Sequence, residues 1–307
     1  MKERVVIATR ERPLALWQAN VSKDRLAQAH PGLAVELLGM RTQGDRWLST
    51  PLSEVGGKGL FIKELEQALL DGRADIAVHS MKDVPAELEP EFVLAAIGFR
   101  DDVRDAMVSP TGARLADLPQ GARIGSASLR RQAQLLARRP DLQVRPVRGN
   151  VGTRLGKLDA GEYDALMLAA AGLKRLGLAG RVTEFLAVED SMPAAGQGAL
   201  GIECLASADK VRALIEPFDD PVAGACVRAE RGVSAGLGAD CSAPLGAYAE
   251  ASPDGTLHLR AILAAPDGSE VLRAAASGRE PAELARRVVA TLASAGAARI
   301  LAALPRH

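Results

Sequence analysis

The sequence predicts an α/β fold in which two linked lobes with mainly parallel sheets surround a cleft, followed by a small C-terminal α+β domain. Short β-branched runs alternate with helical patterns over the first hundred residues. The alternation begins again after the charged stretch at 99–105, and from residue 244 successive strands precede a helix. Alternating strands and helices are typical of parallel sheets with crossover helices, whereas consecutive strands followed by a helix indicate an α+β arrangement.

The first lobe is predicted from residue periodicity and from the residues that begin and end helices. Pro13 begins a helix because proline suits the first helical position, and Gly72 ends another. A strand near Ala199 is expected to return to the first sheet. The predicted elements are strands at 4–9, 34–38, 75–80 and 92–98 and helices at 13–29 and 60–72.

The second lobe and the tail are predicted in the same way. The second lobe has strands at 123–126, 143–147 and 164–169, with helices that follow Ser128 and Asn150. The tail has strands at 244–250, 257–265 and 271–277, separated by PDG turns, and a helix at 281–295. These elements predict domain 1 at 1–99 and 199–217, domain 2 at 105–193, and domain 3 at 221–307.

Composition narrows the class of protein. Hydrophobic residues make up 48% and charged residues 25% of 307 residues, as in ordinary globular proteins. The 38 basic residues balance the 38 acidic ones and aromatic residues are only 3%, which disfavours a nucleic-acid partner. Residues 1–18 contain charges and a proline before any long apolar run, and no stretch reaches the ~18 apolar residues that a membrane span needs. We therefore expect a cytoplasmic location and no membrane partner.

Basic charge is concentrated in one segment. Eight arginines lie between 123 and 154, against the single acid Asp141. Ser128 is a candidate N-cap, which places Arg130 and Arg131 in the first turn of a helix. A cation there is unfavourable by about 0.3–1 kcal/mol, whereas a charged hydrogen bond to a carboxylate contributes about 1.5–3 kcal/mol. The segment therefore predicts a small ligand that carries several carboxylates or phosphates.

Other arginines show the same placement. Arg154 follows a candidate N-cap, and Arg10 precedes the helix that begins at Pro13. Arg138 and Arg139 lie farther along their helix, and a solvated helix face is the favoured interpretation for them. No phosphate loop is present in the sequence, because GGKGLF around Lys58 lacks the required spacing, so carboxylates are favoured over a nucleotide. Lys58 belongs either to a loop that reaches the cleft or to a plain turn.

The segment VHSMKDVP follows the predicted strand at 75–80. Ser80, Lys82 and Asp83 therefore lie at the carboxyl end of a strand, where open α/β sheets bind ligands. Asp83 is a candidate general acid or base, or a counter-charge to a cation. The alternative is a turn-forming aspartate before Pro85. For His79 a packed or hydrogen-bonded histidine is favoured over a ligand.

The chain has three cysteines, an odd number, and lacks a C-x-x-C pair. This pattern fits neither a disulfide framework nor a zinc finger, and we expect no metal. Cys241 lies within LGADCSAPLG, a run of small residues with a proline. Taken by itself, Cys241 is either a small buried hydrophobe or a reactive thiol.

Several motifs together resemble one enzyme family. They are HSMKDVP, GSASLRRQ, VRGNVGTRLGKLDAGEYDALMLAAAGLKRLGL, PAAGQGALGIE and CSAPLGAYA, in this order along nearly the whole chain. They are similar to hydroxymethylbilane synthase, also called porphobilinogen deaminase. The resemblance implies two periplasmic-binding-protein-like lobes and a third domain around a cleft. It also implies a transferase that joins four porphobilinogen molecules head to tail, with release of ammonia, into the linear tetrapyrrole hydroxymethylbilane for haem and related pigments.

The resemblance further implies a dipyrromethane cofactor, bound covalently through a thioether to Cys241, and a monomer. Asp83 corresponds to the catalytic carboxylate, which would contact pyrrole N–H groups and stabilise the cation left when ammonia departs. The implied cofactor-binding residues are Asp83, Lys82, Ser80, Ser126, Ser128, Arg130 and Arg131. The implied substrate-binding residues are Arg10, Arg148, Arg154 and Arg175. Lys58 is a further substrate-binding candidate because of the glycines on either side of it. Three positions differ from the usual family residues: Arg12, Ala127 and Asp240.

Two other classes of protein remain alternatives at the level of sequence. A two-lobed anion-binding or sensor protein would use similar lobes but would need neither Cys241 nor Asp83. A nucleic-acid-binding module would use the arginines but predicts strongly salt-dependent binding and more aromatic residues.

Overall fold

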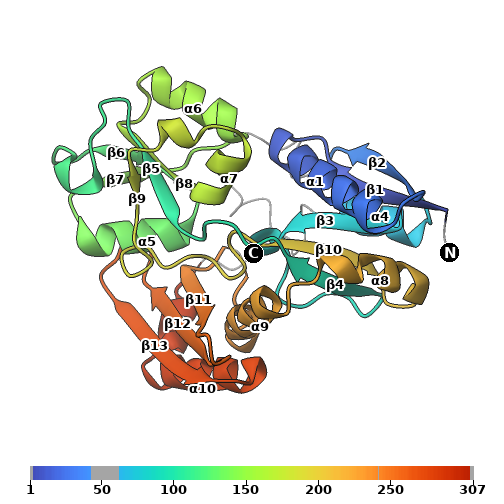
Figure 1. The fold of residues 1–307 in the computed structure, drawn as a ribbon. Helices are drawn as coiled ribbons and strands as arrows, with labels where there is room; N and C mark the ends of the chain where they lie inside the picture. Colours follow the sequence, from blue (N-terminus) through green and yellow to red (C-terminus); the bar gives the residue numbers. More distant parts are fainter. Residues whose placement is uncertain (1–2, 43–61, 241, 305–307) are drawn as a thin grey trace.

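The protein is described by a computed structural model that covers residues 3–42, 62–240 and 242–304. These residues form two five-stranded sheets and one three-stranded sheet, each covered by helices (Figure 1). The predicted fold class is confirmed: two α/β units are followed by a small unit with an antiparallel sheet.

The first sheet has the strand order β2-β1-β3-β10-β4. β1 pairs with β2 and β3 in parallel, whereas β10 is antiparallel to both of its neighbours. The late strand thus returns to the first sheet, as predicted from Ala199. The strands are β1 (Arg4–Arg10), β2 (Ala34–Met40), β3 (Ile76–Ser80), β4 (Phe92–Gly98) and β10 (Leu200–Leu205).

Helices bury both faces of this sheet. Alternate residues of β1 point to opposite faces, so Val5 and Ile7 pack in a core with Leu26 of the first helix. Val6 and Ala8 pack in a second core with α4. The helices are α1 (Pro13–Ala29), α4 (Lys63–Leu70) and α8 (Asp209–Ile215), with short 3₁₀ turns η1 (Met81–Asp83) and η4 (Glu216–Phe218).

The second sheet has the order β7-β6-β8-β5-β9. β6 pairs with β7 and β8 in parallel, and β5 is antiparallel to β8 and β9. The strands are β5 (Asp105–Val108), β6 (Arg123–Gly125), β7 (Gln143–Arg145), β8 (Ala165–Ala169) and β9 (Glu184–Phe185). β5 and β9 are not predicted from the sequence, because β5 is short and begins with a buried aspartate, and β9 has only two residues.

The helices of the second unit begin where the sequence predicts. The Ser128 side chain accepts a hydrogen bond from the Arg131 N–H, and Asn150 accepts one from the Thr153 N–H. Such caps satisfy backbone donors that a helix cannot pair internally. The helices are α5 (Leu129–Arg138), α6 (Val151–Asp159) and α7 (Ala170–Arg175), with 3₁₀ turns η2 (Leu115–Asp117) and η3 (Ala179–Arg181).

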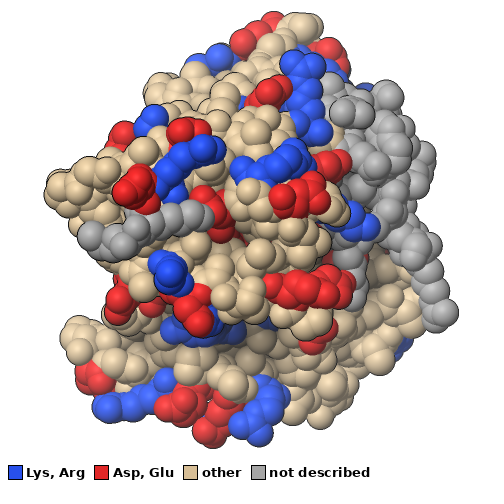
Figure 2. All heavy atoms as spheres, turned by 90° about the vertical axis from the view of Figure 1, so that its right-hand side faces the viewer, with Lys and Arg blue, Asp and Glu red and all other residues tan. Residues whose placement is uncertain are grey.

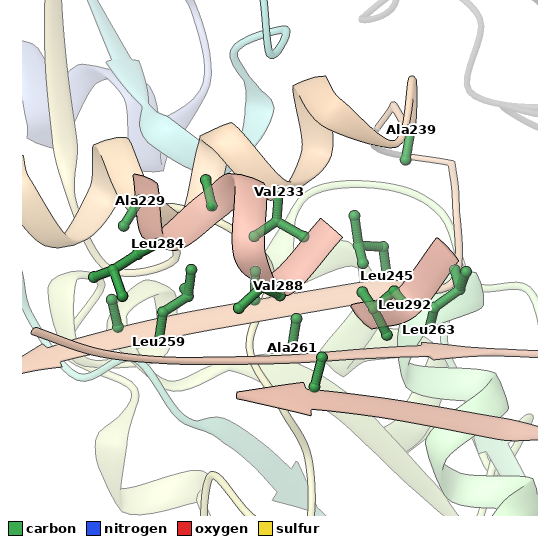
Figure 3. Close-up of a cluster of buried hydrophobic side chains, with 14 of the residues drawn as sticks. Ala229, Val233, Ala239, Leu245, Leu259, Ala261, Leu263, Leu284, Val288 and Leu292 are labelled. Atoms are coloured by element: carbon green, nitrogen blue, oxygen red, sulfur yellow. The ribbon is translucent and has the colours of Figure 1, made fainter. Parts of the chain in front are cut away.

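The third unit is an antiparallel sheet with helices packed on one face. Leu259 and Leu263 of the central strand lie in one core with Val233, Leu284 and Val288 of the two longer helices (Figure 3). The strands are β11 (Leu245–Ala251), β12 (Leu257–Ala264) and β13 (Val271–Gly278). The helices are α9 (Pro221–Gly236), α10 (Pro281–Ser294) and α11 (Ala297–Ala302).

Two chain segments connect the five-stranded sheets, one between β4 and β5 and one between β9 and β10. They are hydrogen-bonded to each other: the Asp101 N–H donates to Gly198 O at 3.1 Å. The Gln197 side chain also donates to Val103 O at 2.7 Å. The two α/β units are therefore joined by a paired connection.

The surface carries both basic and acidic side chains on the face that Figure 2 shows. Acidic and basic side chains are interspersed on the face shown in Figure 2, in line with the balanced composition. Within the described residues, no helix combines the length and the apolar character needed to cross a membrane. The same part of the chain contains no cluster of His, Cys, Asp and Glu side chains suited to a metal ion.

Candidate functional site

The turn η1 carries the acid that the sequence analysis selected. β3 ends at Ser80, and Met81, Lys82 and Asp83 form the turn immediately after it. Met81 is 1% exposed and its N–H donates to Ala199 O at 3.0 Å. This hydrogen bond fixes the turn to the segment that leads into β10. Asp83 is exposed and Lys82 is partly buried, so both side chains lie at the carboxyl end of the strand.

The surroundings of Lys82 lower the pKa of its ammonium group. Burial lowers the pKa of Lys82 to about 8, and the charges of Arg131 and Arg130 act in the same direction. Asp83 and Asp105 oppose this effect. A partly buried cation with this surrounding charge is suited to binding an anionic group of a ligand.

Arg154 of α6 lies near the turn η1, within electrostatic range of Asp83. Its Nε donates to Gly149 O at 2.8 Å, which orients the guanidinium across the start of the helix. Burial lowers the pKa of Arg154 to about 10, with Arg131 and Arg148 acting in the same direction and Asp83 opposing them. The structure thus brings Arg154 within electrostatic range of Asp83, which is about seventy residues earlier in the sequence, and of Arg148.

Arg130 and Arg131 are buried and bind a carboxylate of the chain itself. Arg130 is 4% exposed, Arg131 is 7% exposed, and both donate to Asp105, which is fully buried. The shortest contacts are 2.8 Å from Arg130 and 2.7 Å from Arg131. Ser191 Oγ and Gln197 Nε2 also donate to this carboxylate, at 2.7 and 3.0 Å. The anion expected at the start of this helix is therefore at least partly internal.

Arg138 and Arg139, at the end of α5, pair with carboxylates of the protein. Arg138 pairs with Asp190, and Arg139 pairs with Asp141 at 2.7 Å. Arg139 also donates to the backbone oxygen of Leu115 at 2.9 Å. These two arginines therefore have carboxylate partners within the protein.

The three predicted serines lie at helix and strand ends. Ser80 Oγ accepts a hydrogen bond from Gln18 Nε2 at 2.7 Å, which connects β3 to α1. Ser126 Oγ accepts one from the Ser128 N–H at 3.2 Å, and Ser128 Oγ caps α5. Ser126 is buried and Ser128 is partly buried. Gln18 is a site neighbour that the sequence analysis did not identify.

Arg10 and Arg175 occupy different surroundings. Arg10 ends β1 and is partly buried. Arg175 is 8% exposed, donates to Gly198 O at 2.5 Å and to Phe99 O at 3.3 Å, and lies over the ring of Trp17. Arg175 therefore contacts both connecting segments between the α/β units.

Two predicted site residues, Lys58 and Cys241, lie outside the described residues. Next to Cys241, the Asp240 carboxylate accepts hydrogen bonds from the Ser242 N–H at 2.8 Å and from Ser242 Oγ at 2.5 Å. Of the described cysteines, Cys204 and Cys226 are buried, and burial raises the pKa of both thiols. A raised pKa reduces the thiolate fraction and makes these two cysteines poor nucleophiles.

A second group of titratable side chains lies behind the turn. His79 Nε2 and Glu203 Oε2 are 2.6 Å apart, and Glu203 is fully buried. Burial raises the pKa of Glu66 to about 7, and the negative charges of Glu203 and Glu89 raise it while His79 opposes them. The contact with Glu203 confirms that His79, in β3, is a hydrogen-bonded histidine.

Glu66 is expected to make stability depend on pH. Because its pKa is raised in the folded state, the folded protein holds this proton more strongly than the unfolded chain. The free energy of unfolding is therefore expected to decrease as the pH rises from about 4.5 to about 7, with the contribution lost above 7. Glu66→Gln removes this titration, and urea unfolding at pH 5.5 and pH 8 should show a smaller decrease than in the wild type.

The exposed Glu162 provides a matched control for this measurement. Glu162→Gln should retain the pH dependence of the wild type. Equal pH dependence in wild type and Glu66→Gln would contradict the assignment.

The geometry defines one kind of site. An exposed aspartate, Asp83, lies beside the partly buried Lys82 and within electrostatic range of Arg154, while Arg130 and Arg131 of the same α/β unit act on Lys82. Such an arrangement can bind a ligand with several carboxylates while placing one carboxylate beside a developing positive charge. The fold and the site together therefore define a protein that handles a small polycarboxylate and has a group suited to catalysis.

Comparison with known proteins identifies the family. Residues 5–213 match the family model described as "Porphobilinogen deaminase, dipyromethane cofactor binding domain". Residues 224–294 match "Porphobilinogen deaminase, C-terminal domain". This chain belongs to the porphobilinogen deaminase family.

Individual relatives agree with this result. The porphobilinogen deaminase of Thiobacillus denitrificans is 59% identical over 260 residues, covering 85% of each chain. That of Chromobacterium violaceum is 56% identical over 262 residues, covering 85% of this chain and 84% of the relative. Among solved structures, the methionine binding protein MetQ is similar with a TM-score of 0.45 and 12% identity, covering 71% of this chain and 91% of that chain.

Proposed function

We propose that this chain is a hydroxymethylbilane synthase, which joins four porphobilinogen molecules head to tail and releases four ammonia molecules. The product is the linear tetrapyrrole hydroxymethylbilane, used for haem and related pigments. Membership of the porphobilinogen deaminase family over both matched segments carries this proposal. The charges around η1 support it, because porphobilinogen bears an acetate and a propionate that suit a group of cations.

The chain's own residues fit a dipyrromethane cofactor, the group named in the description of the first family model. Lys82 is a partly buried cation whose pKa is lowered by burial and by the nearby Arg131 and Arg130, and a cofactor with carboxylate side chains would supply compensating negative charge there. When bound, this group supplies the pyrrole end to which substrate units are joined. We propose that Cys241 holds it through a thioether, since both described cysteines are buried.

Asp83 is proposed as the catalytic residue. Its exposed carboxylate can accept hydrogen bonds from pyrrole N–H groups and stabilise the positive charge that remains on the substrate when ammonia leaves. The same carboxylate can assist removal of the proton that is lost when the new carbon–carbon bond has formed. Lys82 next to it holds a carboxylate and thereby positions the ring at Asp83.

The remaining binding roles divide by structural environment. Arg154 lies within electrostatic range of Asp83 and of Arg148, and both arginines are proposed to bind substrate carboxylates. Arg130 and Arg131 are held by Asp105, so we propose that they contribute positive charge to the cofactor site from a fixed position. The other residues proposed to bind cofactor or substrate are Ser80, Ser126, Ser128, Arg10, Arg175 and Lys58.

The organisation of the chain is proposed as follows. Domain 1 comprises 1–99 and 199–217, domain 2 comprises 105–193, and domain 3 comprises 221–307, each containing one sheet. The protein is proposed to act as a monomer on a small molecule without a nucleic-acid or membrane partner. Zero formal net charge and 3% aromatic residues support this proposal. A cytoplasmic location stays a prediction from the sequence.

Intact-mass spectrometry and a turnover assay together test the function. The purified wild type is expected to be heavier than its chain by a two-ring adduct and to convert porphobilinogen into a tetrapyrrole with release of ammonia. Cys241→Ser is expected to have the mass of the chain alone, because oxygen replaces the sulfur that forms the thioether.

Cys226→Ser is the matched control, since Cys226 is buried in the core of the third unit. It should keep the adduct. A wild type without added mass, or an adduct that persists in Cys241→Ser, would contradict the proposed attachment. A loaded wild type that forms no tetrapyrrole would contradict the proposed activity.

A further inference from the structure

Helix α9 of the third unit packs directly beneath the turn that carries Asp83. Val227 of α9 is fully buried in one core with Met81 and Val84. Arg231 lies one helical turn further along the same face, because residues four apart on a helix are neighbours. Figure 1 shows α9 between the third sheet and the end of the first sheet near β4. The turn therefore rests on a helix from a different part of the chain.

The side of the turn before Asp83 is fixed by packing. The Met81 side chain fits against two glycines, and a Cβ atom at Gly201 would lie 2.2 Å from Met81 Sδ. A Cβ atom at Gly196 would lie 2.7 Å from Met81 Cβ. Together with the bond from the Met81 N–H to Ala199 O, these contacts leave Met81 little freedom to move.

The side of the turn after Asp83 is fixed by one guanidinium. Arg231 Nη1 donates to Val84 O at 3.1 Å, and Nη2 donates to Pro85 O at 2.6 Å and to Ala86 O at 3.0 Å. Three successive backbone oxygens are thus bound by a single planar group. Burial lowers the pKa of Arg231 to about 10, so the side chain remains a cation at neutral pH.

These contacts are important because the segment after the turn is irregular. Residues 84–86 belong to no helix or strand, so their carbonyl groups lack the partners that regular structure provides. A charged guanidinium forms stronger hydrogen bonds to such oxygens than a neutral donor does. Removing it would leave carbonyl groups without partners and would allow the backbone next to Asp83 to move.

We propose that Arg231 is a positioning residue for the reaction: by binding the carbonyl oxygens of Val84, Pro85 and Ala86 it holds the Asp83 carboxylate in register with the substrate. The inference rests on the proposed function, since it assigns Asp83 the catalytic role. It also assigns the third unit a part in catalysis that is separate from cofactor attachment. A displacement of about 1 Å in a catalytic group can lower a rate about 100-fold. Hydrogen bonds from Arg231 that keep the backbone next to Asp83 in place therefore affect the rate.

The test compares Arg231→Gln, Arg231→Lys and Arg228→Gln in the full-length protein as purified. Arg228 is exposed on the same helix and serves as the matched control. Arg231→Gln is expected to lower kcat between about 10-fold and 100-fold with KM for porphobilinogen near the wild-type value. Hydrogen exchange should become faster at the Val84 amide, which in the wild type donates to Met81 O at 3.2 Å. Arg231→Lys, which retains a cationic donor, should regain part of the lost kcat.

Three results would overturn the proposal. They are unchanged exchange at Val84 in Arg231→Gln, faster exchange with a wild-type kcat, and an equal loss of kcat in Arg228→Gln. If Arg231→Gln does not fold, Arg231→Lys decides between the same outcomes. Intact mass of each variant separates poor cofactor loading from poor turnover. A loaded wild type without tetrapyrrole formation would contradict the proposed function, and exchange at Val84 would still decide whether Arg231 holds the turn.

Discussion

Asp83→Asn is expected to lower kcat by about 10²- to 10⁴-fold, the range typical for loss of a catalytic acid–base or charge-stabilising group. The amide has nearly the same shape as the carboxylate but cannot neutralise the positive charge that develops when ammonia leaves. Because Asp83 is exposed and its turn is held by Met81 and Arg231, the substitution should leave the fold intact. Tetrapyrrole formation and thermal unfolding, measured on the same preparation, separate the two effects.

Two further variants sharpen this measurement. Asp83→Glu retains the charge and should keep more activity than Asp83→Asn. Glu87→Gln removes an exposed acid four residues further along and should behave as the wild type. Near-normal tetrapyrrole formation by Asp83→Asn would overturn the catalytic assignment and favour the alternative in which Asp83 only shapes the turn before Pro85.

Asp105→Asn is expected to reduce the free energy of unfolding by about 3–5 kcal/mol, the usual effect of removing one partner of a buried ion pair. Asp105 is fully buried and binds Arg130 and Arg131, so its loss leaves two guanidinium groups inside the protein without a compensating charge. Burial opposes ionisation of Asp105, but the two arginines outweigh this effect and hold its pKa well below the ordinary value. Urea unfolding at pH 7 measures the difference.

An exposed ion pair provides the control for Asp105. Asp159 lies 2.5 Å from Arg181 with about half of its side chain exposed, and Asp159→Asn should change stability by about 0–1 kcal/mol. A change of this small size in Asp105→Asn would show that the buried cluster does not stabilise the fold. Since Ser191 and Gln197 also bind Asp105, the variant is expected to loosen the second connecting segment between the α/β units as well.

The two aspartates show how position assigns different roles to one residue type. Asp83 lies exposed at the end of a strand, next to a lysine with a lowered pKa. Asp105 is fully buried at the start of a strand and accepts hydrogen bonds from α5 and from the second connecting segment. The Asp83 carboxylate is accessible to a substrate, whereas all contacts of the Asp105 carboxylate are with the protein itself.

Most secondary structure could be predicted from the sequence because its signals are local. Pro13 begins a helix that ends at Ala29 as predicted, and the strand at 92–98 was predicted with the same bounds. Ser128 and Asn150 cap the helices they were expected to cap. The short strand β5 was missed, because its four residues show no clear periodicity and its first residue is an acid that usually lies at the surface.

The candidate site was predicted in part. Placement of Ser80, Lys82 and Asp83 at a strand end follows from the strand pattern alone, and the resemblance to a family supplied their roles. Which arginines face a ligand does not follow from the pattern, because a buried partner such as Asp105 is distant in sequence from Arg130. Arg231 was not selected for the same reason: its targets are backbone oxygens more than a hundred residues away.

The sequence by itself determined most of the strands and helices, the helix caps and the concentration of arginines, because these depend on residues close together along the chain. Only the tertiary structure decided how those charges are used. It buried Asp105 against two arginines, placed Arg154 within range of Asp83, and brought Arg231 onto the turn after β3. The physical reason is that a charge is stabilised by whatever lies within a few ångströms of it, and folding, not sequence order, determines those neighbours.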